Sequence, residues 1–276
     1  MRILDFHLHV GTRHHWTPWV IDFFEQVNPG YFARFVEEIT PGEVLGYLDE
    51  QGVDRAVMLS EYAPESTGVV TNEFTAEFCR GHERLIPFGS ICLYEGPAPA
   101  EQAERAVKEL GIKGFKMIPP YARFYPNDVS LFPFYELARD LNVPVQFHTG
   151  TSIFKGSRVK YGDPLLVDDV ADAFPTLKII LEHGGRPFWY DRAAWMLTRH
   201  PNVHIGLAGI PAKQLLAHFP KLEHYSDRFV FGSDWPGLPD IRSLAERFAK
   251  LPLRPGTVEA ILWGNGARLL GLAGPA

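Results

Sequence analysis

The first ten residues, Met1-Arg-Ile-Leu-Asp-Phe-His-Leu-His-Val10, place two histidines one residue apart at the end of a short apolar segment. The apolar residues predict a β-strand, and the side chains of a strand alternate between its two faces. We therefore expect His7 and His9 to point the same way, with Phe6 and Leu8 packed on the opposite face. Two imidazoles on one face can bind one divalent metal ion.

Asp5 falls on the histidine face of the same predicted strand. A carboxylate in this position can hold the imidazoles from behind and orient them toward a metal ion. Two ligands do not complete a site, so the other ligands have to come from later in the chain.

The composition excludes several classes of protein. The chain has 276 residues, of which 46% are hydrophobic and 13% aromatic, so it can bury a large core and is not a disordered protein. Its formal net charge of −6 argues against a nucleic-acid partner, because proteins that bind a phosphate backbone usually carry a basic face.

The sequence also lacks the marks of a secreted or membrane protein. Cys79 and Cys92 are too few for a disulfide framework, which indicates a reducing compartment. No stretch approaches the roughly 20 apolar residues that a membrane span needs, and no basic segment precedes an apolar one at the start. We therefore expect a cytoplasmic protein that binds neither membranes nor nucleic acids.

Apolar runs rich in Val, Ile, Leu and Phe recur along the chain, and helical patterns lie between them. Runs without strict alternation are typical of parallel strands that are buried on both faces. The runs repeat about every 30 residues, near the length of one βαβ unit. The predicted strands are 2–9, 54–60, 85–91, 113–118, 143–148, 177–183, 202–207 and 228–233.

This order of elements favours an α/β fold, a (β/α)8 TIM barrel that forms a single domain over residues 1–276. Such barrels are typically about 250 residues long. A doubly wound open sheet is the alternative, but it usually has fewer strands and a Gly-rich phosphate turn, and neither GxGxxG nor GxxxxGK[ST] is present. We expect helices at 98–110, 131–141, 165–174 and 241–251, and a C-terminal helix at 256–272 that completes the outer ring or closes the barrel bottom.

Two long connections interrupt the repeat, an insertion at 14–40 after the first strand and another at 149–163 after the fifth. Loops that follow barrel strands lie at the face where active sites are built. The aromatic residues of the first insertion either contribute to that face or pack on the barrel as an extra helix. They are Trp16, Trp19, Phe23, Phe24, Tyr31 and Phe32.

Residues that can bind metal stand at the ends of several predicted strands. Lys116 lies near the end of the fourth strand, His148 ends the fifth and His183 the sixth, and Asp234 follows the eighth. In a closed barrel the carboxyl ends of the strands converge on one mouth, so residues that are distant in sequence meet there. A single histidine is usually structural, but this combination predicts a metal site.

The segments DFHLH, GFKMIPPYARFYPND, VPVQFHTGTS, LEHGG and FGSDWP resemble the amidohydrolase-related branch of the amidohydrolase superfamily. That branch contains metal-dependent hydrolases of (β/α)8 fold, together with decarboxylases that act on aromatic or muconate-semialdehyde acids. The resemblance spans essentially the whole chain, as far as the GNGAR segment near its end.

The resemblance implies a role for each of these residues. His7 and His9 match the metal ligands of the first strand, and His148 matches the ligand of the fifth. Asp234 resembles the strand-eight aspartate that binds the metal and takes the proton of the attacking water. His183 resembles a strand-six histidine that hydrogen-bonds the bound water or the substrate in single-metal members.

These ligands suit a single divalent ion. Three imidazoles and one carboxylate match Zn²⁺ with an open position for water, and zinc lowers the pKa of that water toward ~7. Mn²⁺ or Fe²⁺ can occupy the same ligands. We expect Zn²⁺ first, with Asp234 and His183 as the catalytic residues.

Three further residues are candidates for substrate binding. In two-metal members of the superfamily a carboxylated strand-four lysine bridges the ions, which would require a carboxylated Lys116 and His183 as a ligand. The GFK-x-x-P pattern instead resembles single-metal members, so we favour one metal and a Lys116 that pairs with a carboxylate.

Arg186 can bind a substrate carboxylate through two hydrogen bonds, and we expect Tyr121 to line the pocket.

The favoured function is a metal-dependent hydrolase that cleaves an amide, ester or lactone bond in a small organic substrate. The alternative is a non-oxidative decarboxylase of an aromatic or semialdehyde acid on the same scaffold. Such decarboxylases are generally longer, so the short chain favours hydrolysis. The large aromatic insertion is a candidate homodimer contact.

Two other functions fit the sequence less well. A nuclease or phosphoesterase is disfavoured by the acidic balance, and phosphate chemistry often uses two metals about 4 Å apart. A non-catalytic protein with a structural zinc is disfavoured because such sites are closed and often rich in cysteine.

Overall fold

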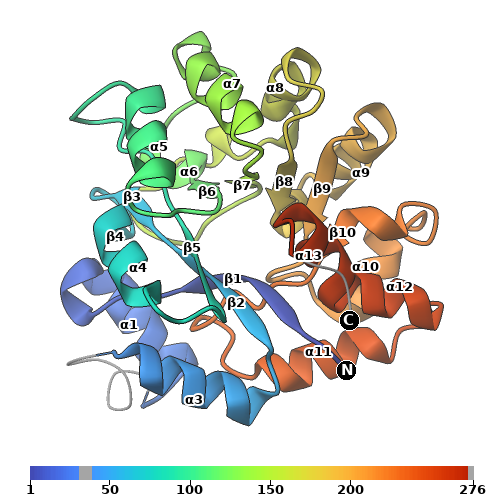
Figure 1. Ribbon diagram of the computed structural model, residues 1–276. Helices are drawn as coiled ribbons and strands as arrows, with labels where there is room; N and C mark the ends of the chain where they lie inside the picture. The colour runs from blue at the N-terminus through green and yellow to red at the C-terminus, as the bar shows by residue number, and fades with distance from the viewer. Residues whose placement is uncertain (31–38, 273–276) are drawn as a thin grey trace.

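The barrel strands are joined edge to edge into a closed ring in the computed structural model, which describes residues 1–30 and 39–272 (Figure 1). Two parallel groups, β1-β2-β5 and β10-β9-β8-β7-β6, meet at both seams, where Gly89 pairs with Phe115 and Leu8 pairs with Trp235. The barrel strands are β1 (Leu4–His9), β2 (Arg55–Leu59), β5 (Leu85–Phe88), β6 (Phe115–Met117), β7 (Val145–His148), β8 (Ile179–Glu182), β9 (Val203–Gly206) and β10 (Phe229–Val230).

Each predicted strand contains one of these observed strands, which confirms the (β/α)8 barrel. The strands are buried on both faces, as expected for a parallel barrel. In β8, for example, Ile180 belongs to an apolar cluster inside the barrel, whereas Ile179 and Leu181 belong to the larger cluster between strands and helices.

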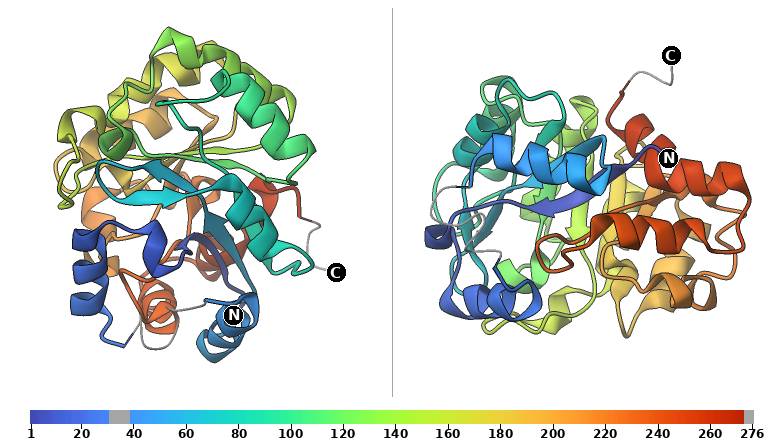
Figure 2. Two further views of the ribbon diagram at one scale, coloured as in Figure 1. Left: turned by 90° about the vertical axis from the view of Figure 1, so that its left-hand side faces the viewer. Right: turned by 90° about the horizontal axis from the view of Figure 1, so that it is seen from below.

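The helices surround the barrel (Figures 1 and 2). The ring closes where the backbone N–H of Arg242 donates to the side chain of Gln51, which joins the last outer helix to the first. No helix in the part of the chain described here is long and apolar enough to cross a membrane. The outer helices are α3 (Pro41–Gln51), α4 (Asn72–Cys79), α5 (Pro99–Lys108), α7 (Phe132–Asp140), α8 (Asp168–Ala173), α9 (Tyr190–Arg199), α10 (Ala212–His218) and α11 (Ile241–Ala249).

The C-terminal segment closes the amino-terminal end of the barrel. Helices α12 (Pro255–Glu259) and α13 (Asn265–Leu269) are joined by a π-helical turn. Trp263 and Leu269 pack in one cluster with Leu4, at the start of β1. The helix predicted at 256–272 is therefore present and covers the barrel bottom.

Insertions after β1, β2 and β7 lie at the opposite end, and the one after β7 is the predicted insertion at 149–163, which contains a short 3-10 turn at Val159–Tyr161. The first, after β1, contains α1 (Pro18–Val27), and its Tyr31 and Phe32 lie outside the described residues. The second, after β2, is an antiparallel hairpin of β3 (Glu61–Ala63) and β4 (Gly68–Val70). The sequence did not predict this hairpin, because strands of three residues are too short for a periodic pattern.

A β-bulge in β1 changes the expected alternation of side chains. Asp5 pairs with Ala56 of β2, but the next paired residue is Leu8, opposite Met58, so β1 holds one extra residue. Phe6 consequently packs inside the barrel against Phe88, with ring centroids 5.5 Å apart, while Leu8 packs in the outer cluster. The prediction that Phe6 and Leu8 share a face is wrong for this reason.

Candidate metal centre

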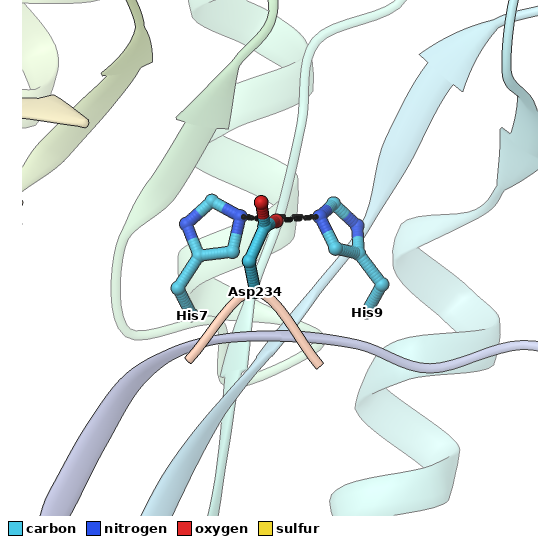
Figure 3. A group of neighbouring side chains, drawn as sticks. All are labelled: His7, His9 and Asp234. Carbon is cyan, nitrogen blue, oxygen red and sulfur yellow. Dashed lines mark hydrogen bonds and ion pairs between the residues drawn. The ribbon is translucent and has the colours of Figure 1, made fainter. Parts of the chain in front are cut away.

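Three of the predicted ligands meet at the carboxyl ends of the barrel strands. Nε2 of His7 lies 3.1 Å from Nε2 of His9, and Oδ1 of Asp234 lies 3.3 Å from the first and 3.5 Å from the second. Figure 3 shows the carboxylate between the two rings. Atoms bound at 2.0–2.1 Å to one tetrahedral zinc ion lie about 3.4 Å apart, so these spacings fit a single ion.

The outer nitrogen of each ring is held by a buried carboxylate. Oε2 of Glu182 lies 3.2 Å from Nδ1 of His7, and Oε2 of Glu61 lies 3.3 Å from Nδ1 of His9. Because a carboxylate accepts, each ring donates its Nδ1–H and turns the lone pair of Nε2 toward Asp234. Three lone-pair donors then converge, an arrangement that calls for a cation between them, either a metal ion or, in its absence, a proton.

The pKa shifts of the protein without metal reflect this convergence. Burial by itself would lower the pKa of His9, but hydrogen bonds to Asp234 and Glu61 raise it to about 9. Burial would likewise raise the pKa of Asp234, yet hydrogen bonds from His7 and His9 hold it well below its usual range. Asp234 is therefore ionised, as a metal ligand must be.

Glu182 ties His7 to the neighbouring strands. Its Oε1 accepts the backbone N–H groups of His183 and Ala208, at 3.3 and 3.1 Å, and the amide of Gln146 donates to Oε2. The side chain is fully buried. These donors fix the carboxylate that orients the His7 ring.

Asp5 supports the backbone of the site instead of the imidazole rings. Its Oδ1 accepts from the backbone N–H of His7 at 3.1 Å and from that of Ser233 at 2.9 Å. Burial raises its pKa to about 7. The predicted contact of Asp5 with the rings is wrong because the bulge between Asp5 and Leu8 breaks the alternation that would place Asp5 and His7 on one face.

His183 and Asp234 share an uncommon backbone conformation. Both have φ of 67°, in the left-handed region that side chains rarely adopt. Such residues cluster at functional sites, where the surrounding structure holds them in place. The strand predicted to end on His183 ends one residue earlier, so the turn and not the strand aims this ring.

The orientation of His183 is fixed by its backbone partner. Its Nδ1 lies 2.8 Å from the carbonyl of Ala208, so Nδ1 carries the hydrogen and Nε2 is left as an acceptor. Burial lowers the pKa of His183 well below its ordinary value, so the ring is neutral.

His148 is separated from the group of His7, His9 and Asp234 by the ring of His183, which lies against both His7 and His148. Its ring packs on those of His183 and Tyr121, with centroids 4.4 and 4.7 Å apart. Its Nε2 faces the carbonyl of Thr151 at 3.2 Å, and the group of mutually close ligand atoms among the described residues is His7, His9 and Asp234. The metal role of His148 stays a prediction.

A cavity of about 310 Å³ opens on this group. The three predicted substrate-binding residues, Lys116, Tyr121 and Arg186, all line it, as do His148 and His183. Part of the cavity wall is aromatic. Its rings belong to Trp16, Phe23, Phe24 and Phe154.

Two cations stand at the polar end of the cavity. Nζ of Lys116 lies 3.4 Å from Nδ1 of His7, and burial lowers the pKa of this lysine to about 8. The guanidinium of Arg186 lies 3.2 Å from Oδ2 of Asp234, packed over Gly209, where a Cβ would overlap it. These two cations are placed to receive an anionic group beside Asp234.

Sequence reasoning did not find Glu61, Glu182 and Gln146. Gln146 and Glu182 are polar residues inside otherwise apolar strands, and this signal could have identified both. Glu61 carries no comparable signal, because it belongs to the unpredicted hairpin.

The fold and the convergent ligands are those of an enzyme of the amidohydrolase superfamily with a candidate metal centre. A model of the amidohydrolase family matches residues 4–272, and the chain belongs to this family. It is 25% identical over 281 residues to the gamma-resorcylate decarboxylase of Polaromonas sp. strain JS666, and the alignment covers 82% of this chain and 85% of that enzyme.

Two solved structures establish the same fold. An uncharacterized TIM-barrel protein from Bordetella bronchiseptica superposes with a TM-score of 0.80, at 24% identity and over 100% of both chains. A dihydroxybenzoic acid decarboxylase from Polaromonas sp. JS666, solved with manganese and the inhibitor 2-nitroresorcinol, gives a TM-score of 0.72 at 19% identity, over 98% of this chain and 97% of that one.

These relatives correct the favoured function. Hydrolysis was expected partly because the chain is short, but the matched decarboxylases align over most of their own length. Chain length therefore does not separate the two activities. The expectation of an amide, ester or lactone hydrolase is wrong, and the decarboxylase alternative agrees better with the comparisons.

Proposed function

We propose that this protein is a metal-dependent, non-oxidative decarboxylase of an aromatic carboxylic acid. The observation that carries the proposal is the cavity, which is lined by aromatic rings, by a metal-ligand group and by two cations. An aromatic ring packs favourably against the edge-to-face pair of Phe23 and Phe154, and a carboxylate suits the two cations. The relationship to gamma-resorcylate decarboxylase supports this assignment.

A single divalent ion held by His7, His9 and Asp234, with His148 as the fourth predicted ligand, would act as a Lewis acid toward substrate oxygens when bound. Nitrogen and carboxylate donors suit Zn²⁺ and Mn²⁺ alike. Manganese is bound in one related decarboxylase structure. We therefore test both ions.

The chain's own residues bind and orient the acid. Lys116 and Arg186 receive its carboxylate, and Tyr121 lies against the ring of His148 at the edge of the same cavity. The neutral Nε2 of His183 accepts a hydrogen bond. A phenolic hydroxyl beside the carboxylate is a substrate group that supplies this donor.

The reaction balances without water or an oxidant. The bond between the ring carbon and the carboxylate breaks, CO₂ leaves, and one proton takes its place on the ring. Asp234 and Nε2 of His183 are the groups that can take a proton from the substrate hydroxyl and return it to the ring carbon, and the phenolate oxygen that remains regains a proton from solvent. The buried walls keep bulk water from competing at that position.

The test is release of CO₂ from 2,6-dihydroxybenzoate by protein loaded with Mn²⁺ or Zn²⁺. We expect one CO₂ and one resorcinol per acid, and one deuterium on the product ring when the reaction runs in D₂O. The methyl ester of the same acid is the control, because it cannot lose CO₂ without prior hydrolysis. A metal-loaded protein that releases no CO₂ from a panel of hydroxylated and unsubstituted aromatic acids would refute the proposal.

A further inference from the structure

The two histidines of β1 are oriented from different parts of the molecule. His7 is held by Glu182, which belongs to barrel strand β8. His9 is held by Glu61, which belongs to the β3–β4 hairpin outside the barrel. The side chain of Glu61 is only 4% exposed, and the residue lines the cavity.

Both oxygens of the Glu61 carboxylate have a partner. Oε2 faces Nδ1 of His9 at 3.3 Å, and Oε1 accepts a hydrogen bond from the hydroxyl of Thr67. Thr67 is buried and precedes β4, on the returning side of the hairpin. The hydroxyl therefore fixes the rotation of the carboxylate, and the carboxylate in turn fixes the imidazole.

The hairpin itself is anchored to the segment that follows β1. The backbone N–H of Thr17 donates to the carbonyl of Thr67 at 3.0 Å, and its hydroxyl donates to the carbonyl of Ser66 at 2.7 Å. Gly68 pairs with Trp16, and a Cβ at Gly68 would overlap the carbonyl of His15. The chain that carries His9 thus folds back and holds the hairpin that orients it.

We propose that Glu61 is a positioning residue for the metal-binding nitrogen of His9, that Thr67 locks it, and that the β3–β4 hairpin thereby sets the metal affinity of the centre. The inference rests on the metal centre of the proposed function. It assigns the hairpin a role that the barrel does not supply, because the barrel orients only the other histidine through Glu182.

The test is the dissociation constant of Mn²⁺ and of Zn²⁺, measured by calorimetry on the full chain without substrate. Removing a carboxylate behind a ligating histidine typically weakens metal binding by about 10–100-fold. We expect Glu61→Ala to weaken binding within that range and Thr67→Val to weaken it by about 10-fold. Thr67→Ser keeps the hydroxyl, and this variant should bind both metals as tightly as the unaltered protein.

The control is Glu65→Gln on the same hairpin. The side chain of Glu65 is 58% exposed and pairs with Arg123 instead of a histidine. This variant should bind both metals with unchanged affinity. If Glu61→Ala does not fold, the Thr67→Val and Thr67→Ser pair still decides the proposal, because both replacements are close in size to threonine.

A spectroscopic measurement separates positioning from a general loss of stability. The visible absorption of the Co²⁺-loaded protein reports ligand geometry, so Glu61→Ala and Thr67→Val should shift it while Glu65→Gln does not. Unchanged spectra and unchanged dissociation constants in both variants would overturn the proposal.

Failure of this inference and failure of the proposed function give different results. Weaker metal binding in the variants, in a protein that releases no CO₂ from any aromatic acid, supports the hairpin's role and refutes only the decarboxylase. If the protein releases CO₂ and the Glu61 and Thr67 variants bind metal as tightly as the unaltered protein, only the hairpin's role is refuted. An unaltered protein that takes up no divalent ion would overturn both.

Discussion

Gly206 in β9 leaves the space that the carboxylate of Glu182 occupies, since a Cβ at this glycine would overlap both carboxylate oxygens. We expect Gly206→Ala to displace Glu182 and, through it, the ring of His7. Overpacking of this kind costs about 1–3 kcal/mol, or a few degrees in Tm for a chain of this size. Thermal unfolding and a metal titration test it, with metal affinity expected to fall about 10-fold.

Gly256→Ala is the matched control for that substitution. A Cβ at Gly256, in α12, would contact nothing. Its Tm and metal affinity should stay those of the unaltered protein. Equal behaviour of the two variants would show that the space beside Glu182 is not needed.

Removal of the metal should lower the stability of the fold. A ligand present at 100 times its dissociation constant stabilises by about 2.7 kcal/mol, which corresponds to roughly 5–11 °C in Tm. We expect dialysis against a chelator to lower Tm by this amount and Mn²⁺ or Zn²⁺ to restore it, but not Ca²⁺, which favours all-oxygen sites. A Tm that does not change on dialysis against the chelator would contradict the presence of a metal centre.

His148→Ala tests the fourth predicted ligand. In the structure its Nε2 faces the carbonyl of Thr151, so binding a metal requires the ring to exchange that partner. We expect the variant to hold less metal per chain, measured by elemental analysis after dialysis. Full occupancy would show that the centre is complete without this histidine.

Asp234→Asn tests the carboxylate between the two histidines. The amide keeps one oxygen that can bind a metal ion but cannot carry a proton between substrate atoms. We expect much of the metal to remain, while kcat for CO₂ release falls by about 10²–10⁴-fold, the usual contribution of general acid–base catalysis. Unimpaired turnover would remove Asp234 from the proton transfer.

His204, in β9, should make the fold sensitive to acid. Burial lowers its pKa from 6.5 to about 4, so between these values the unfolded chain binds a proton that the folded chain does not. Stability is therefore present at neutral pH and lost as pH falls through this window, by about 3 kcal/mol. Urea unfolding at pH 7 and pH 4.5 measures the loss.

The variant that checks this assignment is His204→Asn. Its side-chain amide can still donate to the carbonyl of Ile179, which lies 3.3 Å from Nδ1 of the histidine. The variant should lose less stability than the unaltered protein between the two pH values. An identical loss would place the acid sensitivity elsewhere.

The sequence predicted the barrel and the meeting of His7, His9 and Asp234, because parallel strands have a strong apolar pattern and their carboxyl ends converge. It did not predict the carboxylates of Glu182 and Glu61, which orient the imidazole rings of His7 and His9. Glu61 sits on a hairpin too short to produce a pattern. The direction in which the side chain of Asp5 points depends on the β-bulge in β1, and neither composition nor periodicity predicts a bulge.

The bulge in β1 also bears on how this site tolerates insertions and deletions. A single extra residue lets Phe6 fill the barrel floor while the next residue, His7, reaches the mouth. Deleting one residue there would restore regular pairing with β2, and only one side chain would then face the barrel interior where Phe6 and His7 both do now. The strand would keep its place but lose either the floor residue or a ligand, so the length of this segment is under a constraint that its residue types alone do not reveal.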